Sequence, residues 1–164
     1  MSLNDFVFRP IRQLSHMVRN REVSSVELVN GFIERLERIG SEFNAVVKIT
    51  SERALVEAQC ADEEIARGCY RGPLHGIPYG VKDLLATNSI PTTWGATPFR
   101  NQVFDYDATV IRNLLESGAV LVAKLAMVEL AGGMGYERAD SSFTGPGLNP
   151  WDKRRCSGGS SSGS

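Results

Sequence analysis

The sequence contains few cysteines, and the three that it has form no recognisable pattern. Cys60, Cys69 and Cys156 are odd in number, far apart and without a CxxC pair. Such spacing encodes neither a disulfide framework nor a zinc site. A reducing cytoplasm is therefore the simplest compartment to expect.

Long apolar runs and an excess of one charge are also lacking. No apolar stretch approaches the roughly 20 residues of a membrane span, and the N-terminus lacks the basic start and apolar stretch of a signal peptide. The formal net charge is -1 at pH 7, which gives no electrostatic reason to expect a nucleic acid or an anionic membrane as a partner. We interpret the basic group Lys153, Arg154 and Arg155 as part of a solvated loop.

The composition is that of a globular core, with 42% hydrophobic and 23% charged residues in a length of 164 that fits one domain. Apolar residues at helical spacing predict a helix over 24–40, with Ser24 and Glu27 as a capping box and Gly40 at its end. The same pattern predicts a second helix from Ser51, as its cap, to a stop at Gly68.

Strand signals alternate with these helices. Short apolar runs predict strands at 45–49, 77–81 and 119–123, and the last directly follows a helix predicted from Asp107 to Gly118. A helix that runs into a buried strand is typical of an α/β protein. From Gly132 onward the periodicity disappears, and an unstructured stretch of that length is usually functional or disordered.

The segment GPLHGIPYGVKDLL places a lysine at the end of a predicted buried strand. An ordinary lysine there extends to the surface or pairs with a carboxylate. A desolvated amine is the alternative, and lowering its pKa from about 10.4 to roughly 7 or 8 would let it act as a base. Both interpretations of Lys82 remain open from the residues alone.

The last residues, CSGGSSSGS, have the composition of a flexible linker. However, GPLHGIPYGVKD, PTTWGA, DATVIRNLLESGAVLVAK, GLNPWD and SGGSSSGS occur in this order, and together they resemble the N-terminal part of the amidase signature family. The resemblance runs from about Val23 to the last residue. It favours an active-site segment over a linker.

The resemblance implies an α/β amidase signature fold with a mixed β-sheet core flanked by α-helices, of which residues 1–164 would be the N-terminal portion of a single domain. It implies that Lys82 is the catalytic lysine. It also implies that Ser160, preceded by a cis peptide bond, relays protons between Lys82 and the nucleophile. The nucleophilic serine would belong to a further glycine-rich segment downstream, and the 164-residue chain alone would then be inactive.

Other residues take roles from the same resemblance. Gly158, Gly159 and Ser161 would form the active-site loop around Ser160, and glycines there permit backbone conformations and close approaches that side chains forbid. Residues 131–133, namely Ala131, Gly132 and Gly133, would line the pocket for the acyl group. No metal and no organic cofactor is implied.

Two features bear on the choice among hydrolases. The stretch KLAMVELAGG differs from the asparagine-containing version common in the amidotransferase branch, which favours a plain amidase. His75 invites a Ser-His-Asp arrangement, but it lies in a turn, where a structural role is the better interpretation. His16 is expected on a surface helix.

The predicted function is hydrolysis of a carboxamide to a carboxylate and ammonia or an amine, through a serine acyl-enzyme. One alternative is the glutaminase component of the tRNA-dependent amidotransferase, which performs the same chemistry within a complex. A second is a non-catalytic chain that only binds or assembles. The expected partners are a small-molecule amide, no nucleic acid for a plain amidase, no membrane, and either a second copy or a complementing second chain.

Overall fold

The computed structural model describes residues 6–132 and 142–164. The chain divides into two compact units, each built from three separate stretches. Unit 1 comprises Met1–Arg35, Thr50–Tyr79 and Arg112–Val122, and unit 2 comprises Leu36–Ile49, Gly80–Ile111 and Ala123–Ser164.

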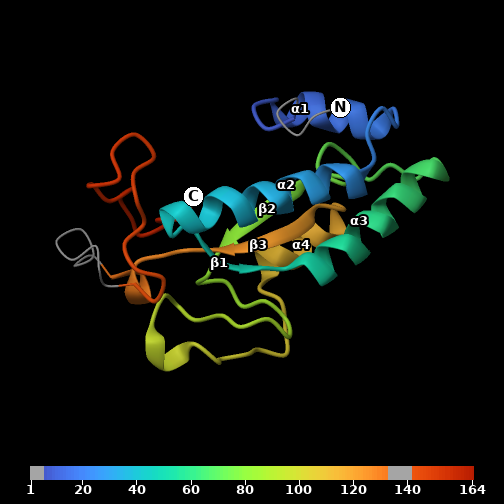
Figure 1. The fold of residues 1–164 in the computed structure, drawn as a ribbon. Helices are drawn as coiled ribbons and strands as arrows, with labels where there is room; N and C mark the ends of the chain where they lie inside the picture. Colours follow the sequence, from blue (N-terminus) through green and yellow to red (C-terminus); the bar gives the residue numbers. More distant parts are fainter. Residues whose placement is uncertain (1–5, 133–141) are drawn as a thin grey trace. The chain divides into compact units, whose positions relative to one another are not determined.

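A three-stranded sheet has the order β1-β3-β2 (Figure 1). Its strands are β1 (Val46–Ile49), β2 (Pro78–Lys82) and β3 (Val120–Leu125). Strands β1 and β3 are antiparallel. The N–H of Val120 donates to the carbonyl of Ile77, and the N–H of Asp83 donates to the carbonyl of Leu125, so residue numbers rise together along β2 and β3 and these two strands are parallel. The sheet is therefore mixed, and all three strands fall where the apolar runs predict them.

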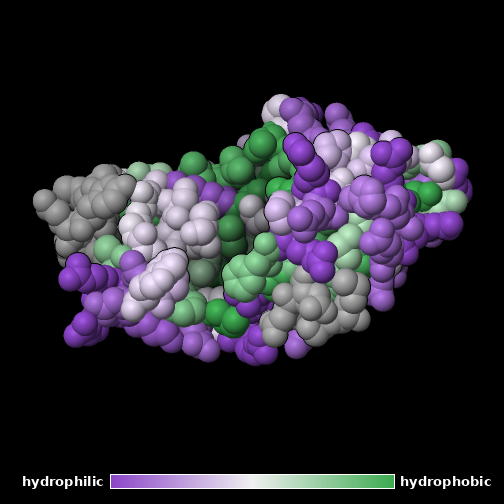
Figure 2. Space-filling model, turned by 90° about the horizontal axis from the view of Figure 1, so that it is seen from above, coloured by the Kyte–Doolittle hydropathy of each residue, from purple (hydrophilic) through white to green (hydrophobic). Residues whose placement is uncertain are grey.

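The helices in the described part of the chain are α1 (Ile11–Arg19), α2 (Ser25–Ile39), α3 (Ser51–Ala66) and α4 (Thr109–Glu116). Side chains of α1, α2 and α3 contribute to the apolar core of unit 1, and Figure 2 shows hydrophilic residues gathered over α1 and α3. His16 lies exposed on α1, as expected. The buried core residues of unit 1 are Phe6, Leu14, Met17, Val18, Val23, Leu28, Ile65 and Ile77.

The predicted capping box of α2 is confirmed. The backbone N–H of Ser24 donates to Oε2 of Glu27 at 2.9 Å, and the N–H of Glu27 donates to Oγ of Ser24 at 3.0 Å. The prediction for α3 was wrong by one residue, because Thr50 is the N-cap and Ser51 is the first helical residue. The hydroxyl of Thr50 does not cap α3; it donates to the carbonyl of Leu121 at 2.6 Å.

Unit 2 holds mainly short turns and loops. Its 3₁₀ turns are η2 (Gly40–Phe43), η3 (Thr97–Phe99) and η4 (Glu129–Ala131). Over residues 142–164 the structure contains turns and an isolated bridge between Leu148 and Cys156, with no helix or longer strand. None of the helices in the described ranges combines the length and the hydropathy that a membrane crossing requires.

Candidate active site

The side chains of Lys82 and Ser160 meet in unit 2, although 78 positions separate them in the sequence. Lys82 is the last residue of β2, so the strand fixes its backbone. Its Nζ donates a hydrogen bond to Oγ of Ser160 at 2.6 Å, and both residues are partly buried. An amine and a hydroxyl at this distance can exchange a proton directly.

The loop that carries Ser160 has an unusual backbone. The Gly159–Ser160 peptide bond is cis, and Gly158 has a φ of +95°, which favours glycine. A Cβ on Gly159 would lie 2.7 Å from Cγ2 of Val128, so a side chain has no room there. The conformation of Gly158 and the close approach at Gly159 therefore both disfavour a side chain, whereas Ser161 is exposed.

Backbone hydrogen bonds attach this loop to the segment after β3. The N–H of Val128 donates to the carbonyl of Ser160 at 3.0 Å, and the N–H of Gly163 donates to the carbonyl of Ala126 at 3.0 Å. Both bonds hold the main chain and leave the Ser160 hydroxyl to Lys82. The Ser160 loop is thus attached at Ser160 and three residues after it.

The residues predicted to line the acyl pocket form a tight turn directly after Val128. Leu130 and Ala131 have left-handed φ values of 50° and 53°. The N–H of Ala131 donates to the carbonyl of Val128 at 2.9 Å, and that of Gly132 donates to the carbonyl of Glu129 at 2.9 Å. Val128 therefore connects this turn to the Ser160 loop, while Gly133 lies outside the described residues.

A buried ion pair adjoins Lys82 and was not among the predicted site residues. Nζ of Lys124 in β3 lies 3.2 Å from Oδ1 of Asp83, and both side chains are fully buried. A sequence signal for this pair exists, because Lys124 interrupts the apolar run AVLVAKLAM and a buried charge requires a partner.

His75 belongs to a different cluster, in unit 1. Its Nε2 lies 3.2 Å from Oε2 of Glu64, and its Nδ1 accepts a hydrogen bond from the backbone N–H of Arg71 at 3.1 Å. Burial lowers the pKa of His75, although the Glu64 carboxylate opposes this shift. These contacts fit the structural interpretation of His75.

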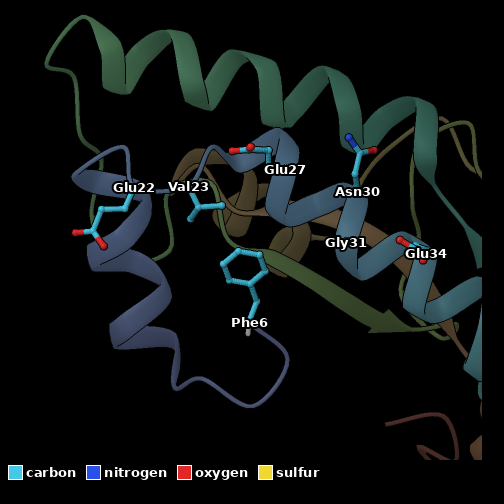
Figure 3. Close-up of a pocket in the computed structure, with 7 residues that line it drawn as sticks. All are labelled: Phe6, Glu22, Val23, Glu27, Asn30, Gly31 and Glu34. Atoms are coloured by element: carbon cyan, nitrogen blue, oxygen red, sulfur yellow. The ribbon is translucent and has the colours of Figure 1, made fainter. Parts of the chain in front are cut away.

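A hollow of about 400 Å³ in unit 1 is lined by Phe6, Val23 and residues of α2 (Figure 3). Three carboxylates, those of Glu22, Glu27 and Glu34, border it, and the carboxylate of Glu27 accepts a hydrogen bond within the capping box. None of the predicted site residues borders this hollow.

The described residues contain no group of three or more His, Cys, Asp and Glu side chains that could hold a metal ion. The cysteines Cys60, Cys69 and Cys156 are free and exposed.

Comparison with known proteins identifies the family of the chain. The family model described as Amidase matches residues 27–164. The chain is an α/β protein of the amidase class, and it belongs to the amidase family.

Curated relatives carry two kinds of name. The chain is 44% identical over 154 residues to a component of the glutamyl-tRNA(Gln) amidotransferase from Geobacter sp. (strain M21), and 41% identical over 153 residues to a putative amidase, AmiD, from Mycobacterium bovis. These alignments cover 94% and 93% of this chain but 31% of each relative. The chain thus spans about a third of the length of the curated relatives that it matches.

Solved structures give the same result. The peptide amidase from Stenotrophomonas maltophilia superposes with a TM-score of 0.85 at 31% identity, over 97% of this chain and 33% of that one. A peptide amidase in complex with the competitive inhibitor chymostatin gives a TM-score of 0.86, also at 31% identity, and covers 98% of this chain and 34% of that one. The predicted amidase fold is therefore confirmed.

Proposed function

We propose that the protein hydrolyses a carboxamide to a carboxylate and ammonia or an amine, with Lys82 as the base and Ser160 as the proton relay. The 2.6 Å hydrogen bond between Lys82 Nζ and Ser160 Oγ is the observation that carries this proposal. The family of the chain and the amidase names among its relatives support it.

A serine hydroxyl is a weak nucleophile at neutral pH and needs a base to remove its proton. In the proposed mechanism the nucleophile gives its proton to Ser160 Oγ as it attacks the amide carbonyl, and Ser160 passes its own proton to the neutral amine of Lys82. The protonated Lys82 then returns a proton, through Ser160, to the departing amine or ammonia. Water repeats the sequence to release the carboxylate from the acyl-enzyme.

The nucleophile of this mechanism is a serine which, by the family resemblance, lies in a segment C-terminal to Ser164. The turn of Ala131 and Gly132 would contact the acyl part of the substrate, because it is attached through Val128 to the Ser160 loop. We place the protein in a reducing cytoplasm, which its three free cysteines support.

The amidotransferase interpretation remains a second candidate because the relative that is 44% identical is an amidotransferase component. In that case the amide is glutamine and the chain works with a complementing partner. The two functions differ in a simple measurement. A plain amidase hydrolyses simple carboxamides alone, whereas the glutaminase component releases ammonia from glutamine efficiently only within its complex.

The test of the main proposal uses the full-length protein and a panel of small carboxamides, with ammonia release as the measurement. The Lys82→Ala variant should lose about 10² to 10⁴ in kcat, since general-base assistance contributes this much. Its unfolding midpoint should stay close to that of the wild type, because Lys82 is only partly buried.

The matched control is Lys48→Ala, which removes an exposed lysine from β1. It should leave both kcat and the unfolding midpoint unchanged. A Lys82→Ala enzyme that keeps most of its kcat would refute the proposed role of Lys82.

A further inference from the structure

Lys124 is a charged residue in a strand where every neighbouring position is apolar. Strand β3 is buried from Val120 to Lys124, and the side chain of Lys124 has no exposed surface. Removing an ammonium group from water is strongly unfavourable unless a partner and hydrogen bonds compensate the lost hydration. Apolar residues in place of a buried ion pair often give equal stability, so stability alone does not account for a buried lysine at this position.

The contacts of Lys124 show where that charge acts. Its Nζ donates three hydrogen bonds, to the carbonyl of Leu85 at 2.7 Å, to Oγ1 of Thr87 at 3.0 Å and to Oγ1 of Thr92 at 2.9 Å, so its contact with Asp83 is an ion pair without a hydrogen bond. All of these partners belong to the segment that follows Lys82. Three hydrogen bonds and one ion pair therefore join Lys124 of β3 to that segment.

Asp83 is held from its other side as well, through its second carboxylate oxygen and its main chain. Its Oδ2 accepts from the backbone N–H of Thr93 at 3.0 Å and from the Thr93 hydroxyl. Its own N–H donates to the carbonyl of Leu125 at 2.9 Å, and its carbonyl accepts from the N–H of Trp94 at 3.2 Å. Both the main chain and the carboxylate of the residue after Lys82 are thus fixed.

The position of Asp83 has a consequence for Lys82. An unpaired carboxylate one residue away would attract the Lys82 ammonium, draw it from Ser160 and favour its protonated form, which is not a base. Lys124 occupies that carboxylate. Lys48 is opposite Lys124 in the β1–β3 register but is exposed, and the threonines around the pair are uncharged.

We propose that Lys124 is a positioning residue for the amidase site: by neutralising Asp83 and binding the segment after β2, it directs Lys82 toward Ser160. This inference rests on the proposed function, in which Lys82 is the base. The Lys124 contacts that carry the inference are to Asp83 and the segment after it, so Lys124 acts on Lys82 through Asp83.

The test compares Lys124→Gln, Asp83→Asn and the double variant with both changes, in the full-length protein. Lys124→Gln removes the charge but keeps a side-chain donor. We expect its kcat to fall by about a hundredfold, the loss that a displacement of roughly 1 Å can cause, with KM unchanged. The acid limb of its kcat/KM profile should shift to higher pH, because the unpaired carboxylate stabilises the Lys82 ammonium.

The double variant separates positioning from mere packing. It removes both charges, so the acid limb should return to the wild-type pH and kcat should recover at least about tenfold relative to Lys124→Gln. A Lys124→Gln enzyme with wild-type kcat and pH profile would overturn the proposal. So would a lower kcat with an unshifted acid limb that Asp83→Asn does not rescue. Lys48→Gln is the matched control and should behave as the wild type.

A milder variant keeps the inference testable if Lys124→Gln fails to fold. Thr92→Val removes one acceptor of Lys124 without leaving a charge unpaired, and it should lower kcat a few-fold, roughly the cost of one hydrogen bond, with KM unchanged. Wild-type kcat in this variant would count against the proposal. Failure of the proposed function is distinct, because it would appear as full activity in Lys82→Ala.

Discussion

Unit 1 and unit 2 differ in the kind of structure of which they are built. The buried apolar cluster of unit 1 consists of side chains from its helices and the segments beside them. In unit 2, loops dominate, and five of the six non-glycine residues with positive φ in the described part of the chain occur there. Those five are Asn44, Ser89, Trp94, Leu130 and Ala131.

We interpret this difference as a separation of stability, in unit 1, from chemistry, in unit 2. Regular helices on an apolar core supply stability, whereas left-handed residues and polar contacts in loops place side chains for chemistry at a cost in backbone strain. Lys82, Ser160, Asp83 and Lys124 all belong to unit 2. Variants in the core of unit 1 should therefore change stability without changing kcat, and variants of the partly buried Lys82 and Ser160 should do the reverse.

The largest effect on kcat is expected for Ser160→Ala. It removes the hydroxyl that links Lys82 to the nucleophile, and kcat should fall by about 10² to 10⁴ because the relay acts with the base as a unit. The unfolding midpoint should change little, since the bond from Val128 to the Ser160 carbonyl remains.

Ser41→Ala is the matched control, because Ser41 is an exposed serine of unit 2 in η2. It should retain the wild-type kcat. A Ser160→Ala protein whose unfolding midpoint falls markedly together with its kcat would contradict the division between the two units.

The same division explains which features the sequence predicts. Periodic apolar residues and the Ser24–Glu27 box predict α2 because local spacing determines an amphipathic helix. The contact between Lys82 and Ser160 has no local signal across 78 positions, and only the family resemblance brings the two residues together. The Asp83–Lys124 pair was missed for the same reason, since the apolar run around Lys124 shows that a partner is needed but not which one.

In unit 1, the largest loss of stability is expected for Leu28→Ala. Leu28 lies in the core with no exposed surface, and truncating a buried leucine to alanine costs about 2–5 kcal/mol. Chemical denaturation of the full-length protein should show this loss, with kcat unchanged in the folded fraction. Leu115→Ala, at an exposed leucine of α4, should cost less than about 0.5 kcal/mol.

A tenfold fall in kcat in a fully folded Leu28→Ala protein would contradict the expectation that variants in the core of unit 1 leave kcat unchanged. It would mean that the core of unit 1 also determines the geometry around Lys82.

His75 should give unit 1 a pH-dependent stability. Because burial lowers its pKa in the folded state, the unfolded chain binds a proton more readily, and stability falls as pH decreases below about 6.5, the ordinary value for histidine. One group contributes at most about 1.4 kcal/mol per pH unit. Denaturation between pH 7.5 and 5.5 should show this slope.

The His75→Asn variant keeps an acceptor for the N–H of Arg71 but does not titrate, and its slope in this range should be smaller. The pKa of Glu64 is lowered by its hydrogen bonds with Arg71, so its own contribution is lost only at more acidic pH. An unchanged slope in His75→Asn would show that another group is responsible.

The smallest effect is expected at the start of α2, where Ser24→Ala removes one half of the capping box. The hydroxyl of Ser24 accepts from the N–H of Glu27 and donates to its carboxylate, and the loss of such a cap costs about 1 kcal/mol. Ser24→Thr retains the hydroxyl and is the matched control. Chemical denaturation should rank the two variants, and kcat should be the same in both because the cap stabilises a helix without contacting Lys82 or Ser160. A Ser24→Ala protein as stable as Ser24→Thr would show that solvent satisfies the N–H of Glu27 equally well, whereas a change in kcat alone would place the start of α2 within the catalytic machinery.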